Sequence, residues 1–340
     1  MKEDLFLVLY NHFGSPKLKA YEDIDISFND LIRRRSKINS DTVEEYCADC
    51  IALLERLTEA DCEKACQLLD TVLILSGPNE DIQKLLYFYY KELESNEIAR
   101  YPLEFDPCAI KGKVSSQIPV IGDPTIKEFN ELQNFPFVSS AISSSWNASH
   151  KWKNPQFWLK LAAYRYFPVE IGSSYLEADW SQDFIQLKAY LDDYVFSSTP
   201  SKIAYIAQHN WVHQLPVLKE DFEIPELCDF FLADSLTDAM VHFWFGMAGT
   251  QTPLHYDKYN NFFCQVVGTK KVILVNPSHR HLFSDGSNTC PVHGDQLDTL
   301  LTTVPHHTVI VDAGQTLFIP KGWWHQVESL SFSISLSFWF

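Results

Sequence analysis

Basic side chains are scarce in this sequence. Its 27 lysines and arginines stand against 44 aspartates and glutamates, which gives a net charge of −17 at pH 7. An acidic surface repels phosphate backbones and attracts cationic partners. We therefore expect a partner with basic residues, and nucleic acid is disfavoured as the main partner. The basic cluster at residues 33–37 fits a solvated helix face or turn better than a nuclear-import signal.

Long apolar runs are also missing. No window approaches eighteen consecutive apolar residues, so we expect no membrane span. The start, Met1-Lys-Glu-Asp, lacks the charged-then-apolar pattern of a signal peptide. Without a secretion route, the eight cysteines are expected to be thiols, in a protein of the nucleus, the cytoplasm or both. The 46% of apolar residues is typical of a globular chain of one large or two ordinary domains.

Apolar residues follow a helical period in the first part of the chain. Between residues 41 and 93 they recur at intervals of three and four, which predicts three helices with short connections. The spacing of Thr58 and Asp61 resembles a capping box that opens the second helix, and Gly-Pro-Asn at 77–79 separates the second from the third. The sequence thus predicts an all-α module over residues 1–105, with its first forty residues helical in part.

The pattern changes after an aperiodic, proline-containing stretch at 101–120, where we expect a domain boundary. Helical segments are predicted at 125–133, 154–163 and 179–194. Beyond residue 200, short β-branched and aromatic segments predict strands. These strands are expected at 241–245, 262–267, 271–275, 308–311, 316–319 and 332–339. Several short strands at this spacing suggest a barrel or jelly roll, so the predicted fold class is α+β.

A metal-binding pattern lies among these strands. His255 and Asp257 are two residues apart, and on a strand such residues point to the same face. Residues 314–327 predict a strand, a Pro/Gly turn and a strand that delivers His325. Two imidazoles and one carboxylate form the facial triad of non-haem iron(II) oxygenases, whereas a structural zinc site needs a fourth ligand. His-x-Asp alone equally fits a turn aspartate and a packed histidine; the downstream Ile-Pro-x-Gly-Trp-Trp-His favours the metal. Other histidines, such as His209, lack this context and are assigned to surface or packing positions.

Four cysteines offer a second metal hypothesis. Cys47, Cys50, Cys62 and Cys66 have spacings compatible with a four-thiolate zinc site. All four lie on the inward stripes of predicted helices, where cysteine packs as a small apolar residue. We favour packing over zinc.

Six segments occur together in one known family and in a consistent order. They are FPVEIGSSY from Phe167, YIAQH from Tyr205, WFG from Trp244, TPLHYD from Thr252, NFFCQVVGTKK from Asn261 and FSISLSFW from Phe332. They resemble the jumonji-C oxygenases, and most closely the arginyl-hydroxylase subgroup, also called lysine demethylase eight or jumonji domain-containing protein five. The resemblance spans residues 118–340 and implies a jumonji-C double-stranded β-helix, a cupin-like jelly roll. The helical N-terminal module matches that subgroup in layout.

The resemblance implies Fe(II) as the metal, with 2-oxoglutarate and O2 as co-substrates. It makes His255, Asp257 and His325 the catalytic metal ligands. The distal carboxylate of 2-oxoglutarate needs a buried cation, because an unpaired buried charge is costly. The residues implied to bind or enclose 2-oxoglutarate are Lys270, Tyr205, Thr252, Asn261, Gln208 and Trp339. Threonine at 252 replaces the usual serine of the subgroup and keeps the hydroxyl.

The implied reaction is hydroxylation of a protein residue, with peptidyl arginine preferred. Glu170 and Trp244 match substrate-binding positions of the subgroup, and Tyr175 is expected to assist them. A carboxylate receives a guanidinium through two hydrogen bonds, and an indole face holds a cation. The alternatives are a histone N-methyl-lysine demethylase, a tRNA hydroxylase, which the charge disfavours, and a non-catalytic binding barrel, which would ordinarily have lost a triad ligand or Lys270. Whether the helical module recruits a partner or forms a homodimer stays open.

Overall fold

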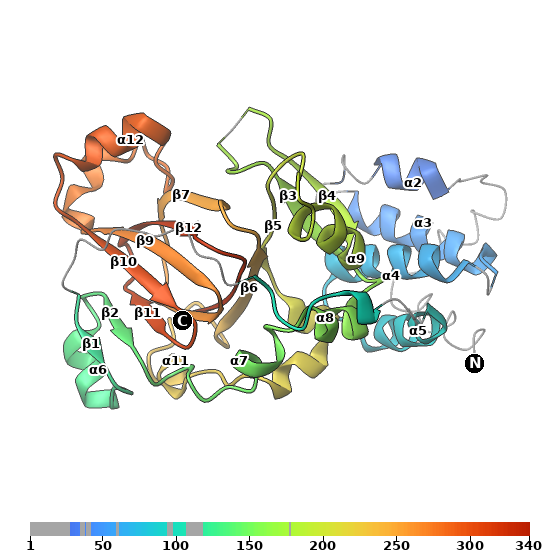
Figure 1. Cartoon of the computed structure of the whole chain (residues 1–340), viewed down its shortest axis with the longest axis horizontal. Coiled ribbons are helices and arrows are strands. Elements are labelled where there is room, and N and C mark those ends of the chain that lie inside the picture. Colours follow the sequence, from blue (N-terminus) through green and yellow to red (C-terminus); the bar gives the residue numbers. More distant parts are fainter. Residues whose placement is uncertain are drawn as a thin grey trace.

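The structure is a computed structural model that describes residues 28–34, 38, 42–58, 61–93, 98–106, 118–176 and 178–340. Helices of the N-terminal part gather at one end of an elongated molecule, and the strands fill the other end (Figure 1). Among the described residues, no helix has the length and apolarity needed to cross a membrane. The predicted α+β class, with an all-α part before a jelly roll, is confirmed.

The N-terminal helices form a bundle with a core of its own. They are α2 (Phe28–Arg34), α3 (Val43–Arg56), α4 (Cys62–Ser76) and α5 (Glu80–Tyr90), followed by the 3-10 turns η4 (Lys91–Leu93) and η5 (Ile98–Arg100). Each buries one apolar stripe, as the helical period predicted. Asp61 rather than Thr58 is the N-cap of α4, and the Thr58 hydroxyl donates to Asp61 Oδ2 at 2.8 Å just outside the helix. The prediction for residues 1–27 lies outside the described residues.

Two sheets form the C-terminal part. The nine-stranded sheet has the order β1-β2-β11-β8-β13-β6-β5-β3-β4, and the four-stranded sheet has the order β10-β9-β12-β7. The first contains β1 (Val120–Ile121), β2 (Phe137–Ser139), β3 (Tyr166–Ile171), β4 (Ser181–Gln186), β5 (Ala204–His209), β6 (Met240–Gly246), β8 (Asn261–Val267), β11 (Thr316–Ile319) and β13 (Ser333–Trp339). The second contains β7 (Gln251–Tyr256), β9 (Thr269–Val275), β10 (His306–Asp312) and β12 (Trp324–Ser329). All six strands expected after residue 240 are present.

Short helices cover the outer face of the nine-stranded sheet. They are α6 (Ile126–Leu132), α7 (Ala148–Lys151), α8 (Pro155–Ala162), α9 (Leu187–Tyr190), α10 (Trp211–Gln214) and α11 (Glu226–Phe230); α12 (Gly294–Leu301) packs on the other sheet. Side chains alternate along β6, so Phe243 and Phe245 pack against Trp158 and Trp211 in an aromatic core. Trp244 points to the opposite side, toward the space between the sheets.

The helix predicted over residues 179–194 is wrong in its first half. Residues 181–186 form β4, which pairs with β3 in an antiparallel ladder over six positions. Only α9 and the π-turn at 191–195 are helical. The weak local helix preference is overridden here by backbone hydrogen bonds with the preceding strand β3.

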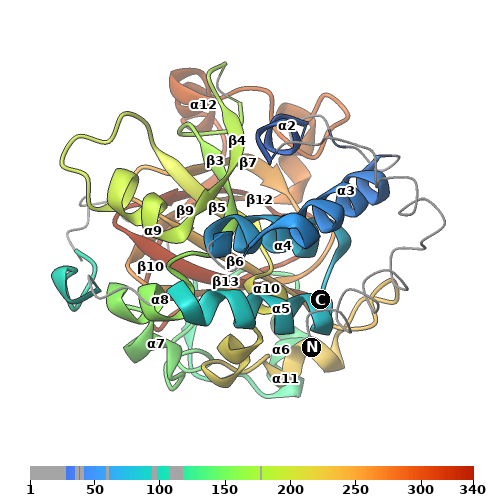
Figure 2. The ribbon, with the colours of Figure 1, turned by 90° about the vertical axis from the view of Figure 1, so that its right-hand side faces the viewer.

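The boundary between residues 1–105 and 118–340 stays a prediction. Residues 107–117 lie outside the described residues. Helix α4 lies against β3 and α10, and Figure 2 shows the N-terminal helices in front of the sheets in that view.

Candidate metal centre and co-substrate pocket

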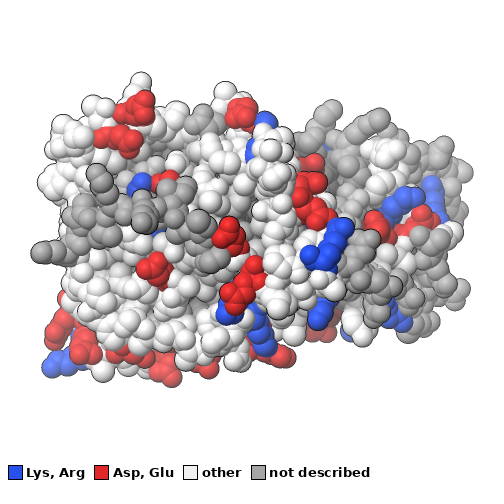
Figure 3. Space-filling view, in the orientation of Figure 1, with Lys and Arg blue, Asp and Glu red and all other residues white. Residues whose placement is uncertain are grey.

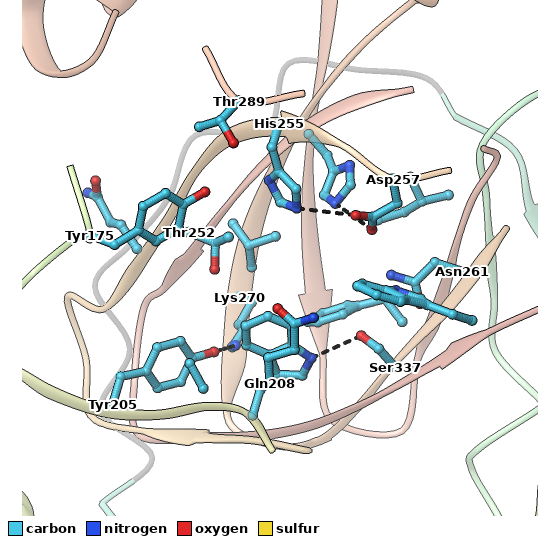
Figure 4. A pocket seen from close by; sticks show the side chains of 18 of the residues that line it. Tyr175, Tyr205, Gln208, Thr252, His255, Asp257, Asn261, Lys270, Thr289 and Ser337 are labelled. Carbon is cyan, nitrogen blue, oxygen red and sulfur yellow. Dashed lines mark hydrogen bonds and ion pairs between the residues drawn. The ribbon is translucent and has the colours of Figure 1, made fainter. Parts of the chain in front are cut away.

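A pocket of about 260 Å³ opens between the two sheets. It brings together all twelve residues that the sequence predicted for the site, from both sheets and from the loops beside them. They are Glu170, Tyr175, Tyr205, Gln208, Trp244, Thr252, His255, Asp257, Asn261, Lys270, His325 and Trp339. His255 and Asp257 lie across the pocket from Tyr205 and Lys270 (Figure 4). The pocket therefore has a metal-ligating end and a cationic end.

Three side chains at one end have the arrangement of metal ligands. His255 lies opposite His325 in the β7–β12 ladder. Asp257 Oδ1 is 3.7 Å from His255 Nε2, and Asp257 Oδ2 is 3.6 Å from His325 Nε2. Asp257 stands one residue beyond the end of β7, so its side chain lies beside His255 as the spacing predicted, but its backbone is not part of the strand. The ligand atoms of His255, Asp257 and His325 all lie within 4.8 Å of one another, and among the described residues this is the one group of such side chains that could hold a metal ion.

Hydrogen bonds orient both imidazoles for ligation. His255 Nδ1 lies 2.8 Å from the Pro253 carbonyl, and His325 Nδ1 lies 3.0 Å from the Trp323 carbonyl. A carbonyl only accepts, so each ring carries its proton on Nδ1 and presents the Nε2 lone pair to the cluster. Burial lowers the pKa of His325 well below its usual value, which keeps the ring neutral, and burial raises the pKa of Asp257. Two neutral imidazoles and one carboxylate fit iron(II) with its other positions open.

The opposite end holds a buried cation. Lys270 is 1% exposed, and its Nζ donates to the Tyr205 hydroxyl at 2.6 Å. No acidic partner accompanies it within the described part of the chain, and burial lowers its pKa to about 7. Asn261 Oδ1 and Trp339 Nε1, which also line the pocket, are buried without a partner in the described residues. Buried polar groups without partners are costly, so this lining fits an anionic, hydrogen-bonding ligand such as 2-oxoglutarate.

The pocket also contains residues that the sequence reasoning missed. Ser337 Oγ accepts a hydrogen bond from Trp244 Nε1 at 3.0 Å, which fixes the plane of the indole. Thr289 lies in the loop before α12 and forms an isolated antiparallel β-bridge with His255. Ser337 was accessible to prediction, since it lies two residues before Trp339 on β13 and shares its face. No sequence signal pointed to Thr289.

The positions of the four N-terminal cysteines favour a packing role over a zinc site. Cys47, Cys50, Cys62 and Cys66 are buried in the core of the helical bundle. Burial raises the pKa of Cys47 and of Cys66 to about 12, which opposes the thiolate that zinc needs.

Comparisons with known proteins agree with this geometry. A family described as a cupin-like domain matches residues 125–340. Jumonji C domain-containing protein 5 of Drosophila melanogaster is 32% identical over 306 residues, 84% of this chain and 76% of the fly protein. Lysine-specific demethylase 8 of Xenopus tropicalis is 33% identical over 261 residues, 69% of this chain and 58% of the frog protein. Lysine-specific demethylase JMJ30 of Arabidopsis thaliana is 34% identical over 219 residues, 61% of this chain and 50% of the plant protein.

The metal assignment is tested by removing one ligand. His325→Ala should weaken Mn(II) or anaerobic Fe(II) binding by more than about 100-fold, because loss of an outer-shell partner alone costs 10–100-fold. Calorimetric titration measures this directly. His306→Ala is a matched control: its Nδ1 also lies 3.0 Å from the carbonyl two residues earlier, but it stands outside the cluster. Unchanged metal affinity in His325→Ala would refute the assignment.

The buried lysine predicts a pH dependence. A bound dicarboxylate supplies the missing negative charge and raises the pKa of Lys270 from about 7. Below pH 7 the amine is already charged and 2-oxoglutarate affinity should be level. Above pH 7 binding must take up a proton, so affinity should fall by up to about tenfold per pH unit.

Calorimetry of the Mn(II)-loaded protein between about pH 6 and pH 9 measures this slope. Lys270→Arg is the control, because its side chain stays charged throughout and binding should lose the pH dependence. A level affinity in the wild-type protein up to about pH 9 would contradict the lowered pKa of Lys270 in the ligand-free pocket.

The close contact of Gly246 with Tyr205 predicts a second effect at this end. A Cβ at Gly246 would lie 2.8 Å from Tyr205 Cε2 and closer still to Cδ2, so the ring would move away from Lys270. Gly246→Ala should lose about 1.5–3 kcal/mol of 2-oxoglutarate affinity, roughly tenfold or more. Gly122→Ala is the control, since a Cβ there meets nothing within 4 Å. Equal affinities in the two variants would show that Tyr205 does not hold the ligand.

Proposed function

The chain belongs to the cupin-like jumonji-C oxygenases, of the type of Jumonji C domain-containing protein 5, and we propose that it hydroxylates a peptidyl arginine. It is a 2-oxoglutarate-dependent oxygenase by family. The relatives carry both JmjC and demethylase names, so the family alone does not choose the reaction. The chain covers between half and about three quarters of the length of these relatives, so its substrate is argued from its own pocket.

The observation that carries the proposal is the carboxylate of Glu170 in the same pocket as the metal ligands. Glu170 lies on β3 opposite Tyr205 of β5 and lines the pocket. It is partly buried, and burial raises the pKa of its carboxyl. A partly desolvated carboxylate is stabilised by a cation that brings its own hydrogen bonds. The planar fork of a guanidinium supplies two at once, which a lysine ammonium does not.

Aromatic side chains complete a site for a cation. Trp244 lines the pocket with its indole held by Ser337, and its face is suited to a cation–π contact. Tyr175 is 36% exposed and also lines the pocket, where it would contact the substrate side chain (Figure 4). These residues would orient the arginine side chain, and the apolar walls Phe263, Ile319 and Val327 would limit water.

The proposed roles divide the pocket among the described residues. His255, Asp257 and His325 would hold Fe(II). Lys270, Tyr205, Asn261 and Thr252 would hold 2-oxoglutarate, with Gln208 and Trp339 enclosing it. The iron centre, when loaded, supplies the oxidation of a C–H bond by O2 with conversion of 2-oxoglutarate to succinate and carbon dioxide.

Surface charge supports a protein substrate over nucleic acid. Acidic side chains are scattered over the face seen in Figure 3, with a row along its lower edge. The tRNA wybutosine-synthesizing protein 5 of Gallus gallus is 34% identical, but over only 37% of this chain. A chain of net charge −17 repels a phosphate backbone, so we favour a basic peptide.

Glu170→Gln tests the substrate proposal, because it keeps the shape and removes the charge. With an arginine peptide, kcat/KM for oxidation should fall at least roughly 30-fold. This corresponds to a loss of about 2–5 kcal/mol of binding free energy when one partner of a buried charge pair is removed. Uncoupled turnover of 2-oxoglutarate to succinate should persist. The exposed Glu131→Gln on α6 serves as the control and should behave as wild type.

Mass spectrometry of a peptide library distinguishes the rival reactions. Arginine hydroxylation adds one oxygen atom, whereas lysine N-demethylation removes one methylene unit. Loss of methylene from lysine peptides, or arginine oxidation that Glu170→Gln leaves unchanged, would refute the proposal while the iron site still stands.

A further inference from the structure

Asp70 of the helical bundle is fully buried against the oxygenase part of the chain. It lies on α4, and its Oδ1 accepts hydrogen bonds from Arg165 Nη2 at 2.7 Å and from Gln214 Nε2 at 2.8 Å. Its Oδ2 accepts the backbone N–H of Tyr166 at 2.9 Å. Arg165 directly precedes β3, Tyr166 is the first residue of β3, and Gln214 is the last residue of α10. One carboxylate therefore connects the bundle to β3 and to the helix that follows β5, and both strands line the pocket.

The carboxylate determines which way the Gln214 amide points. Gln214 Nε2 faces Asp70 Oδ1 and the Tyr166 carbonyl at 3.0 Å, both of which only accept. The amide nitrogen must therefore stay on that side, and Oε1 must face His209 Nε2, with which it is in hydrogen-bond contact. Because Oε1 only accepts, His209 carries a proton on Nε2. Asp70 thus selects the tautomer of a histidine that it does not touch.

His209 ends the strand segment that presents Gln208. The β5–β6 ladder pairs Ile206 with Phe245 and His209 with Phe243, so β5 holds one extra residue at this point. This is a β-bulge. Gln208 has φ +47°, the only positive φ of a residue other than glycine among the described residues, and it lines the pocket. A strained backbone conformation of this kind persists only when neighbouring contacts fix it. The hydrogen bond between His209 and Gln214 fixes the residue next to Gln208.

We propose that Asp70 is a positioning residue for the pocket: through Gln214 and His209 it holds the β5 bulge that presents Gln208. The helical bundle thereby takes part in binding 2-oxoglutarate without contributing a residue to the pocket. This inference rests on the proposed role of the pocket in binding 2-oxoglutarate. Figure 2 shows α10 next to the bundle helices in that view, and α10 lies against α4.

Gln214→Met in the full-length protein tests the relay. It keeps the length of the side chain and the Asp70–Arg165 ion pair but removes both ends of the amide. We expect the KM for 2-oxoglutarate to rise about tenfold, the loss typical of one good hydrogen-bonded contact, with a smaller change in kcat. Gln83→Met is a matched control, because Gln83 Nε2 also joins the bundle to this region by donating to the His213 carbonyl at 2.8 Å. It should lower Tm less, because this bond is exposed, and leave KM unchanged.

A double variant separates positioning from general stability. If Gln214 acts through Gln208, then Gln208→Ala/Gln214→Met should have the KM of Gln208→Ala alone. Additive effects, an unchanged KM in Gln214→Met, or an equal rise in Gln83→Met would overturn the inference.

Nitrogen NMR of His209 gives a readout that does not depend on turnover. The wild-type ring should show the Nε2-protonated tautomer, and Gln214→Met should lose that preference. A tautomer that Gln214→Met leaves unchanged would overturn the relay. If the wild-type protein failed to bind 2-oxoglutarate while the tautomer still responded, the proposed function would fail and the hold on the bulge would stand.

Discussion

The antiparallel pairing of β7 with β12 is the contact on which the pocket depends. It sets His255 opposite His325, with the ring centroids 4.2 Å apart, so two imidazoles approach one point from neighbouring strands. On its other edge β12 pairs with β9, where Ser329 lies opposite Lys270. One four-stranded sheet therefore carries two residues of the candidate metal centre and Lys270, at a spacing that its backbone hydrogen bonds hold constant.

The buried polar groups of the pocket lower the stability of the fold, and apolar packing elsewhere must offset that loss. Lys270 is buried with the Tyr205 hydroxyl but no acidic partner among the described residues, and Asn261 Oδ1 is buried there without a hydrogen bond, so both oppose folding. The nine-stranded sheet compensates on its outer face, where Phe243 and Phe245 pack with Trp158 and Trp211 under the helices. Alternation along β6 separates the two tasks, since the same strand places Trp244 in the pocket. Binding groups thus line the inner face while the outer face supplies the apolar core.

The helical bundle is joined to this architecture by a buried ion pair. Arg165 and Asp70 are 8% and 0% exposed and meet through two hydrogen-bonding nitrogens of the guanidinium. Removing one partner of such a pair leaves a buried charge, which is far more costly than a surface pair. The bundle is consequently continuous with the oxygenase part at this contact, although its apolar core is separate.

The sequence by itself determined most of the element types, the charge and the candidate metal-ligating residues, because periodicity and ligand spacing are local properties. The strands after residue 240 and the triad followed from such patterns, and the family segments supplied the identities of Lys270 and Glu170. Tertiary structure alone decided that residues 181–186 are a strand, since their partner β3 lies in another segment. It also decided that Thr289 borders His255 and that Asp70 meets Arg165, 95 residues away. Contacts between distant segments depend on how the sheets and helices close around one another, and no local pattern encodes that closure.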